Sequence, residues 1–238
     1  MEGKIIMPDT AANYLRIKKN MEEILVKSGR KADDALLIAV SKTKPIELMQ
    51  PVYDAGCRDF GENHVQEIVD KYDKMPSDIR WHMIGHLQTN KVKYIVDKVY
   101  MIHSVDSLHL AEVISKEAVK KNVTVKILLE VNVAEEESKF GTTLEECRNL
   151  YESVVKLPNL DVRGLMTIAP YVADPEENRQ YFANLRQLSV DLFEQNADNK
   201  SDVLLSMGMS NDYAVALEEG ATMIRVGTDI FGERVYNV

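Results

Sequence analysis

Short runs of strand-forming residues alternate with helical segments along nearly all of the 238-residue chain, and this alternation constrains the fold most. Eight strand and helix units can be counted. The predicted strands are residues 36–41, 58–61, 80–84, 99–103, 123–133, 160–166, 203–206 and 223–226, after a leading helix at 13–28. Helices between successive strands favour parallel pairing, so eight units without a linker predict an α/β fold, a single-domain (β/α)8 TIM barrel over residues 1–238. An open doubly wound sheet is the alternative.

Charge and composition exclude several classes of protein. The formal net charge of −9 lacks the basic surface that a broad nucleic-acid site needs, and no uninterrupted apolar run is long enough to span a membrane. Cys57 and Cys147 have no partner spacing, so neither a disulfide framework nor a cysteine-based metal site is predicted. We therefore expect a cytoplasmic monomer that binds no nucleic acid, membrane or metal.

The first predicted strand runs into a lysine. In "LLIAVSKTKP", Lys42 comes directly after the apolar residues, and functional residues of a (β/α)8 barrel follow the C-terminal ends of strands. If Ile38 and Val40 face the barrel interior, Lys42 shares their face, where a partly desolvated ammonium is a good precursor of a Schiff-base nucleophile. Lys44 has the same parity, so alternation alone does not separate the two lysines. A solvated strand end is the alternative interpretation.

Polar residues also follow the second and third predicted strands. Asn63 opens "NHVQ", and an asparagine with Gln66 three residues later predicts a capping box at a helix N-terminus, which is compatible with a further role in a site. His86 follows the third strand, where a lone histidine is only a weak indication of catalysis. The other histidines near strands show no metal-ligand spacing with a carboxylate or cysteine; they are His82, His103 and His109.

The most informative motifs, "SMGMSND" and "RVGTDIFG", follow the seventh and eighth predicted strands. Loops at these two positions are the usual phosphate site of the barrel, because glycine lets an anion approach backbone N–H groups near a helix N-terminus. The candidate residues are Ser206, Gly208, Ser210, Gly227 and Thr228. The alternative is that the glycines only form turns and that Ser210 or Asn211 only caps a helix. A Schiff-base lysine and a phosphate site together describe a phosphorylated aldehyde, for which pyridoxal phosphate is the obvious candidate.

Seven segments, in the same order, resemble those of the pyridoxal phosphate homeostasis proteins, the YggS/PROSC family. They are "LLIAVSKTKP", "FGENHVQE", "WHMIGHLQTNK", "SKFG", "RGLMTI", "SMGMSND" and "MIRVGTDIFGER". The resemblance implies a barrel like the N-terminal domain of alanine racemases, with pyridoxal 5'-phosphate bound as an aldimine to Lys42. It also implies that Asn63 lies beside the cofactor, that the "SMGMS" and "VGT" residues hold the phosphate, and that Arg225 lies near the pyridine nitrogen. The family varies at His86, and Met207 stands where other aliphatic residues are usual.

The resemblance implies a cofactor carrier or a regulator of vitamin B6 pools, with pyridoxal-phosphate-dependent apo-enzymes as recipients, and no reaction of its own. Chemistry agrees, because a guanidinium at Arg225 disfavours protonation of the pyridine nitrogen and makes the ring a poorer electron sink. Only a dozen residues follow the eighth predicted strand, so we expect no second domain and a cofactor that is open to solvent. Two alternatives stay open: a small fold-type III amino-acid racemase or decarboxylase, and a Schiff-base sugar-phosphate aldolase.

Overall fold

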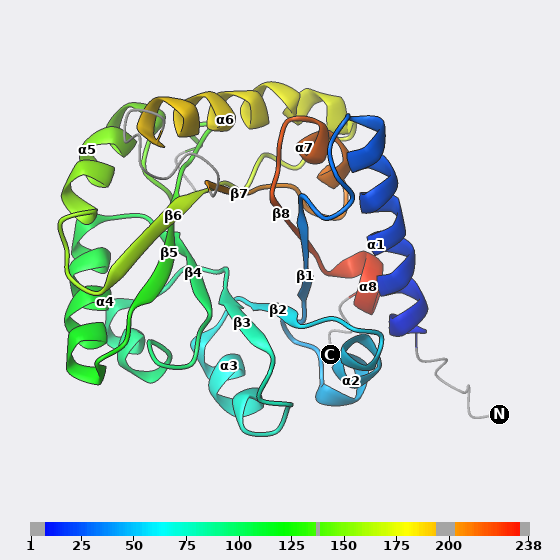
Figure 1. Ribbon diagram of the computed structural model, residues 1–238, viewed down its shortest axis with the longest axis horizontal. Coiled ribbons are helices and arrows are strands. Elements are labelled where there is room, and N and C mark those ends of the chain that lie inside the picture. The colour runs from blue at the N-terminus through cyan, green and yellow to red at the C-terminus, as the bar shows by residue number, and fades with distance from the viewer. Residues whose placement is uncertain (1–7, 137–138, 194–202, 234–238) are drawn as a thin grey trace.

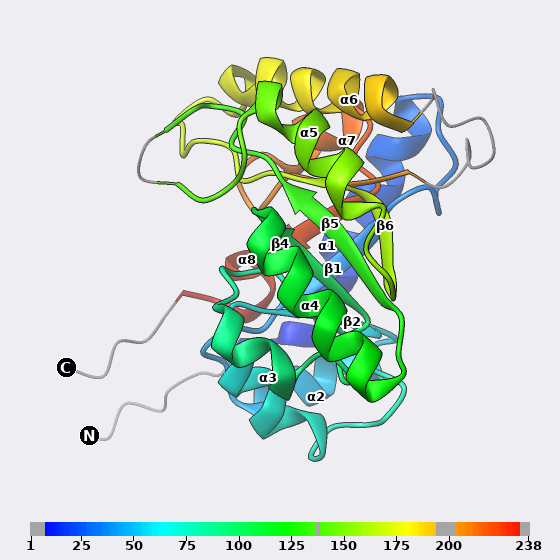
Figure 2. The same cartoon turned by 90° about the vertical axis from the view of Figure 1, so that its left-hand side faces the viewer.

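Eight parallel strands close into one barrel in sequence order, with helices around the outside, in the computed structural model (Figure 1 and Figure 2). The structure describes residues 8–136, 139–193 and 203–233. The strands are β1 (Leu36–Val40), β2 (Asp59–Glu62), β3 (Arg80–Met83), β4 (Met101–Val105), β5 (Val125–Glu130), β6 (Leu160–Met166), β7 (Leu204–Ser206) and β8 (Met223–Val226). The closed barrel confirms the predicted fold and excludes the open sheet.

The outer layer is formed by helices that connect the strands. The α-helices are α1 (Thr10–Lys27), α2 (Ile46–Asp54), α3 (Val65–Tyr72), α4 (Leu108–Lys121), α5 (Leu144–Val154), α6 (Arg179–Phe193), α7 (Tyr213–Glu218) and α8 (Thr228–Phe231), and the 3-10 helices are η1 (Thr89–Tyr94) and η2 (Pro175–Asn178). Helix α8 is too short to cover the barrel at β8 and β1. Helix α1, which packs on α2, α7 and α8, completes the layer there (Figure 1). No helix in these described parts of the chain is long and apolar enough to cross a membrane.

Side chains alternate along the strands between the barrel interior and the layer of helices, as a period of two requires. On β1, Leu37 and Ala39 pack into the large cluster between barrel and helices, whereas Ile38 belongs to a separate cluster inside the barrel. The other fully buried members of that inner cluster come from four further strands and are Met101, Leu128, Met166 and Met223. The inward face of β1 is therefore the one that leads to Lys42, as predicted.

The fifth strand is shorter than predicted. We expected residues 123–133, but β5 ends at Glu130, which pairs with Met166, the last residue of β6. The Val131 N–H still donates to the Met166 carbonyl at 2.8 Å, but the next bridge, from Val131 to Thr142, is isolated and lies outside the barrel strands. Strand β2 begins and ends one residue later than predicted, so its last residue is Glu62, which is fully buried.

Candidate functional site

A cavity of about 290 Å³ lies at the C-terminal ends of the strands. This volume is close to the lower end of the range of about 300 to 1,000 Å³ that is typical of small-molecule sites. Its walls are formed by Val40, Lys42, Lys44, Asn63, Ile84, Ile168, Tyr171, Met209, Ser210, Asn211, Arg225, Gly227, Thr228 and Gly232. One cavity therefore brings together six of the eight residues expected to bind a cofactor, and Ser206 and Gly208 are outside its walls.

The two lysines after β1 both reach the cavity, but their surroundings differ. Lys42 is half-buried and follows Ile38 and Val40 on the inward face of the strand. The Lys44 ammonium donates to three backbone carbonyls at the end of α8, those of Phe231, Gly232 and Glu233, at 3.3, 2.8 and 2.8 Å. Cations suit the carbonyl end of a helix, so Lys44 ties the loop after β1 to α8.

The backbone on both sides of Lys42 is held by charged residues of β2 and α3. The Lys71 ammonium donates to the Ser41 carbonyl at 3.0 Å and to Glu62 Oε1 at 2.8 Å, and the Ser41 hydroxyl donates to the same carboxylate oxygen at 2.6 Å. Burial raises the pKa of Glu62 to about 7, although Lys71 and Ser41 oppose this. On the other side, the Thr43 N–H donates to the Glu67 carboxylate, and Thr43 has a positive φ of 61°. These contacts fix the turn in which Lys42 lies.

Asn63 lines the cavity, but it does not cap a helix. Helix α3 begins at Val65, its N-cap residue is His64, and no side chain makes a capping hydrogen bond there. The predicted capping box is therefore wrong, because the helix starts one residue later than "NHVQ" indicated. A long-range contact fixes Asn63 instead: a Cβ atom on Gly85 would lie only 2.5 Å from the Asn63 carbonyl oxygen, so the glycine after β3 allows this close approach.

The loop after β7 is held in shape by a buried carboxylate. Asp212 accepts from the Met209 N–H at 2.7 Å and from the Asn178 side chain at 2.8 Å. Gly208 has a φ of +90°, and a Cβ there would lie 2.6 Å from Ala216 Cβ, so glycine is required where the loop passes the start of α7. The loop presents Ser210 to the cavity, two strands away from Lys42 around the barrel, with β8 between them.

The loop after β8 forms the adjoining wall through Gly227 and Thr228. A Cβ on Gly227 would lie 3.2 Å from the Val40 carbonyl oxygen, which explains how the two chain segments approach so closely. Thr228 begins α8, where the first N–H groups have no acceptor within the helix. The two loops therefore line the same cavity, and that their hydroxyl and N–H groups hold a phosphate there stays a prediction.

Arg225, on β8, lies at the base of the cavity. Its guanidinium is almost fully buried and donates to the Ser206 hydroxyl at 2.7 Å and to the Thr167 carbonyl at 2.8 Å. Burial lowers the pKa of Arg225 to about 10, against the opposing effect of Glu130 and Asp212, so the group stays cationic at neutral pH. Ser206 thus lies behind the arginine as its acceptor, and the structure does not bring it to the cavity wall where we expected it.

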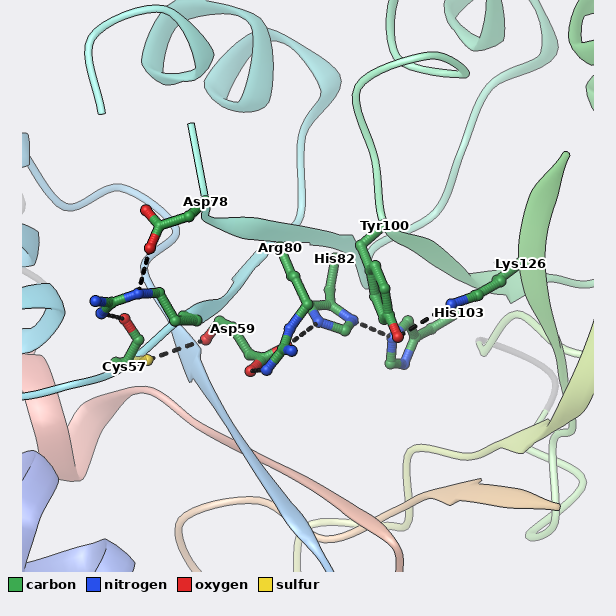
Figure 3. Close-up of polar contacts among 9 residues, drawn as sticks. Cys57, Asp59, Asp78, Arg80, His82, Tyr100, His103 and Lys126 are labelled. Atoms are coloured by element: carbon green, nitrogen blue, oxygen red, sulfur yellow. Dashed lines mark hydrogen bonds and ion pairs between the residues drawn. The ribbon is translucent and has the colours of Figure 1, made fainter. Parts of the chain in front are cut away.

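A chain of buried polar side chains continues from Ser206 into the barrel interior, and Figure 3 shows its part from His103 through His82 to Asp59. The Ser206 hydroxyl contacts His103 Nδ1 at 2.9 Å, His103 Nε2 contacts His82 Nδ1 at 2.9 Å, and His82 Nε2 contacts Asp59 Oδ1 at 3.0 Å. Asp59 is also paired with Arg80. Burial, followed by the neighbouring His82 and then Arg225, holds the pKa of His103 well below its ordinary value, so this ring is neutral.

The Asp59 carboxylate only accepts and Arg225 only donates, so with one proton on each histidine ring the two ends of this chain set one proton order. Arginine only donates, so Ser206 accepts from it and offers its own proton to His103 Nδ1. The His103 proton is then on Nε2 and faces His82 Nδ1, which places the His82 proton on Nε2, facing Asp59. Burial alone raises the pKa of Asp59, but hydrogen bonds from His82 and Arg80 bring it below its ordinary value, so the carboxylate is the terminal acceptor.

The sequence did not lead us to this histidine chain. The strand period of two could have indicated it. Trp81 and Met83 pack outside the barrel, so His82 between them faces inward. His103 lies two residues after Met101 on β4 and faces the barrel interior as Met101 does. Within the described residues, no group of three or more His, Cys, Asp or Glu side chains could hold a metal ion.

Residues 13–235 match the family model of the alanine racemase N-terminal domain. A relative from Aquifex aeolicus named pyridoxal phosphate homeostasis protein is 46% identical over 222 residues, which cover 93% of this chain and 96% of the relative. The chain belongs to the pyridoxal phosphate homeostasis protein family. A member of the family from Escherichia coli is 35% identical over 235 residues, 97% of this chain and 99% of the relative. The resemblance drawn from the seven sequence segments is therefore confirmed.

Solved structures agree with the family assignment. The structure of PipY from Synechococcus elongatus with pyridoxal phosphate bound has a TM-score of 0.77 and 36% identity, and covers 89% of this chain and 100% of that chain. Alanine racemase from Clostridium difficile has a TM-score of 0.76 at 15% identity, over 96% of this chain and 61% of the racemase, which shows the shared barrel fold.

Proposed function

We propose that this protein binds pyridoxal 5'-phosphate in the cavity at the strand ends and takes part in intracellular homeostasis of this cofactor. The observation that carries the proposal is that one cavity combines the Lys42 amine, the hydroxyl and N–H donors of two loops, and the Arg225 guanidinium. These groups suit an aldehyde, a phosphate and a pyridine nitrogen respectively. The family name and the ligand in the PipY structure support the same cofactor.

Each of the eight residues predicted from the sequence has a role in this proposal. Lys42 holds the cofactor as an aldimine, Asn63 lies beside the ring, and Ser210, Gly227 and Thr228 bind the phosphate. Arg225 donates to the pyridine nitrogen, and Ser206 orients Arg225 instead of contacting the phosphate. Gly208 serves the turn that brings Ser210 to the cavity.

The charge of Arg225 favours a protein that binds and releases the cofactor without turning over a substrate. Arg225 remains cationic at neutral pH, so it donates to a ring nitrogen and opposes its protonation. A ring that stays unprotonated stabilises a carbanion poorly, which argues against a racemase or decarboxylase. We infer that the protein holds the cofactor and passes it to apo-enzymes.

Borohydride reduction followed by peptide mass spectrometry tests the binding site. We expect the visible imine band of the loaded protein to disappear on reduction, with the adduct on Lys42 and the band absent from Lys42→Ala. Lys44→Met is the matched control and should keep the band, because the Lys44 ammonium donates to backbone carbonyls at the end of α8 and is not the amine that we assign to the aldehyde. An adduct mapped to Lys44 would reject the assignment.

Assays of the loaded protein separate the remaining functions. Transfer to an apo-enzyme without turnover of amino acids supports the carrier. Turnover at about 1 to 1,000 per second that is lost in Lys42→Ala would make it an enzyme. A colourless protein that cleaves a sugar phosphate would favour the aldolase.

A further inference from the structure

A groove of about 970 Å³ adjoins the cofactor cavity. The groove and the cavity share Asn63, Ile84 and Ile168, so a ligand in one lies next to a ligand in the other. The rest of the groove is formed by the start of α3, the segment after β3, η1, the end of β5 and Phe140. None of the residues to which the proposed cofactor site assigns covalent or phosphate contacts lines it.

A buried carboxylate faces this groove from the end of β5. Glu130 is 5% exposed and lines the groove. Across residues 8–136, 139–193 and 203–233, its Oε2 atom has no hydrogen-bond partner. A buried acceptor without a partner destabilises the folded protein, and a donor supplied by a ligand would remove that cost.

The neighbours of Glu130 indicate the charge of that donor. Asp106, near Glu130, adds a second acidic group, and its carboxylate lies 3.5 Å from His86 Nδ1. Arg225, the cation that acts on Glu130 among the residues that the structure describes, directs its hydrogen bonds to Ser206 and Thr167. This end of the groove therefore suits a cationic donor.

The neighbouring wall is aromatic. The Phe140 ring is stacked on the His86 ring, with 3.9 Å between the ring centroids and 14° between their planes, and Phe140 is 55% exposed. Tyr94, 48% exposed, also lines the groove. A carboxylate beside exposed aromatic faces is the combination that recognises organic ammonium groups. Lys91 lines the groove from the exposed surface of η1, which leaves the acidic end as the place for a cation.

We propose that this groove is a second ligand site that binds a primary ammonium group, with Glu130 as its ion-pair partner and the Phe140 ring beside its carbon chain. Such a group belongs to a free amine or to a lysine side chain of a polypeptide. In either case the ammonium is held next to the cavity that contains Lys42.

The test uses full-length protein reduced with borohydride, in which an added amine no longer exchanges with a lysine-bound cofactor. Phenethylamine is titrated and binding is followed by NMR chemical-shift changes, with phenethyl alcohol as the uncharged analogue. We expect the amine to bind at least tenfold more tightly than the alcohol, and Glu130→Gln to remove this preference. Glu112→Gln, an exposed carboxylate on α4, is the matched control and should bind like wild type.

Two outcomes would overturn the proposal: equal affinity of wild type for amine and alcohol, or amine binding by folded Glu130→Gln within twofold of wild type. Phe140→Ala removes an exposed ring and should fold normally; it is expected to weaken amine binding at least threefold, and unchanged affinity would equally reject the site.

A peptide, acetyl-Gly-Lys-Gly-amide, distinguishes the source of the ammonium group. Binding at least tenfold tighter than n-butylamine assigns the groove to a polypeptide lysine, and tighter binding of the free amine assigns it to a small molecule. The same amine titration can be made with protein that carries no cofactor. Absence of amine binding can therefore be told apart from absence of cofactor binding.

Discussion

Replacing the two buried histidines one at a time and together measures how strongly the interior chain is coupled. In His103→Leu, His82 Nδ1 and the Ser206 hydroxyl proton both lose their partners, at 2.9 Å each in the native protein. An unsatisfied buried group costs about 1 to 3 kcal/mol, so this variant should lose about 2 to 6 kcal/mol of unfolding free energy. His82→Leu leaves only His103 Nε2 without a partner, since Asp59 keeps Arg80, and should lose about 1 to 3 kcal/mol.

The double variant is the informative one. With both rings gone, only the Ser206 proton lacks a partner, whereas the two single variants together leave three groups unsatisfied. The double variant should therefore be more stable than the sum of the single losses predicts, by about 2 kcal/mol or more. Unfolding in urea, followed by circular dichroism and by fluorescence of the sole tryptophan, Trp81, gives the free energies and tests whether both probes report one transition. His109→Leu, an exposed histidine on α4, is the control and should be close to neutral. Additivity within about 0.5 kcal/mol would refute the proton order and the coupling derived from it.

Three further predictions concern the loops and Glu130. Ser210→Ala and Thr228→Ala should each weaken pyridoxal phosphate by about 1 to 3 kcal/mol while leaving pyridoxal unchanged, as measured by equilibrium titration; equal losses for both aldehydes would remove the phosphate from these loops. Burial, and then Asp106, raise the pKa of Glu130 to about 7, above its unfolded value of 4.5. Between these two values the folded protein keeps a proton on Glu130 that the unfolded chain has lost, so the free energy of unfolding falls as pH rises from 4.5 to 7. Glu130→Gln should therefore match wild type at pH 4 and exceed it by up to about 3 kcal/mol at pH 8 in urea unfolding, and parallel pH curves would contradict this. Gly208→Ala should lower the free energy of unfolding by about 2 to 4 kcal/mol, because of its positive φ and the contact of the new Cβ with α7. Gly29→Ala, with a φ of +74° and open space around it, should lower it by only about 1 kcal/mol. Similar losses in urea unfolding would show that crowding against α7 contributes nothing.

The parts of the site that could be predicted from sequence depend on local periodicity and on barrel topology. A strand has a period of two, so the inward position of Ile38 carries over to Lys42 without knowledge of any other element. In a parallel barrel all C-terminal strand ends meet at one face, so the loops with Ser210 and Thr228 were expected near that lysine. These inferences need only the strand count and direction.

The parts that could not be predicted depend on register between strands that are distant in sequence. The contacts from Asp59 through His82 and His103 to Ser206 join β2, β3, β4 and β7, and closure of the barrel fixes which of their residues face each other. Asn63 was misread for a related reason. Its position follows from packing against Gly85, and the local pattern "NHVQ" carries no trace of that contact.

The contacts around Lys42 explain how a lysine is held at the end of a buried strand. Entropy normally leaves such a long side chain and its loop disordered, because fixing one residue's backbone costs about 1 to 2 kcal/mol. Here Lys71 binds the carbonyl before Lys42, Glu67 binds the N–H after it, and Lys44 ties the following residue to α8. The first two contacts come from α3 and the third is made to the segment at α8. Each involves a charged group, which makes it stronger than a neutral hydrogen bond. The ordering cost is therefore met when the chain folds, and a ligand that binds Lys42 finds its backbone already in place, which leaves more of the interaction free energy for affinity.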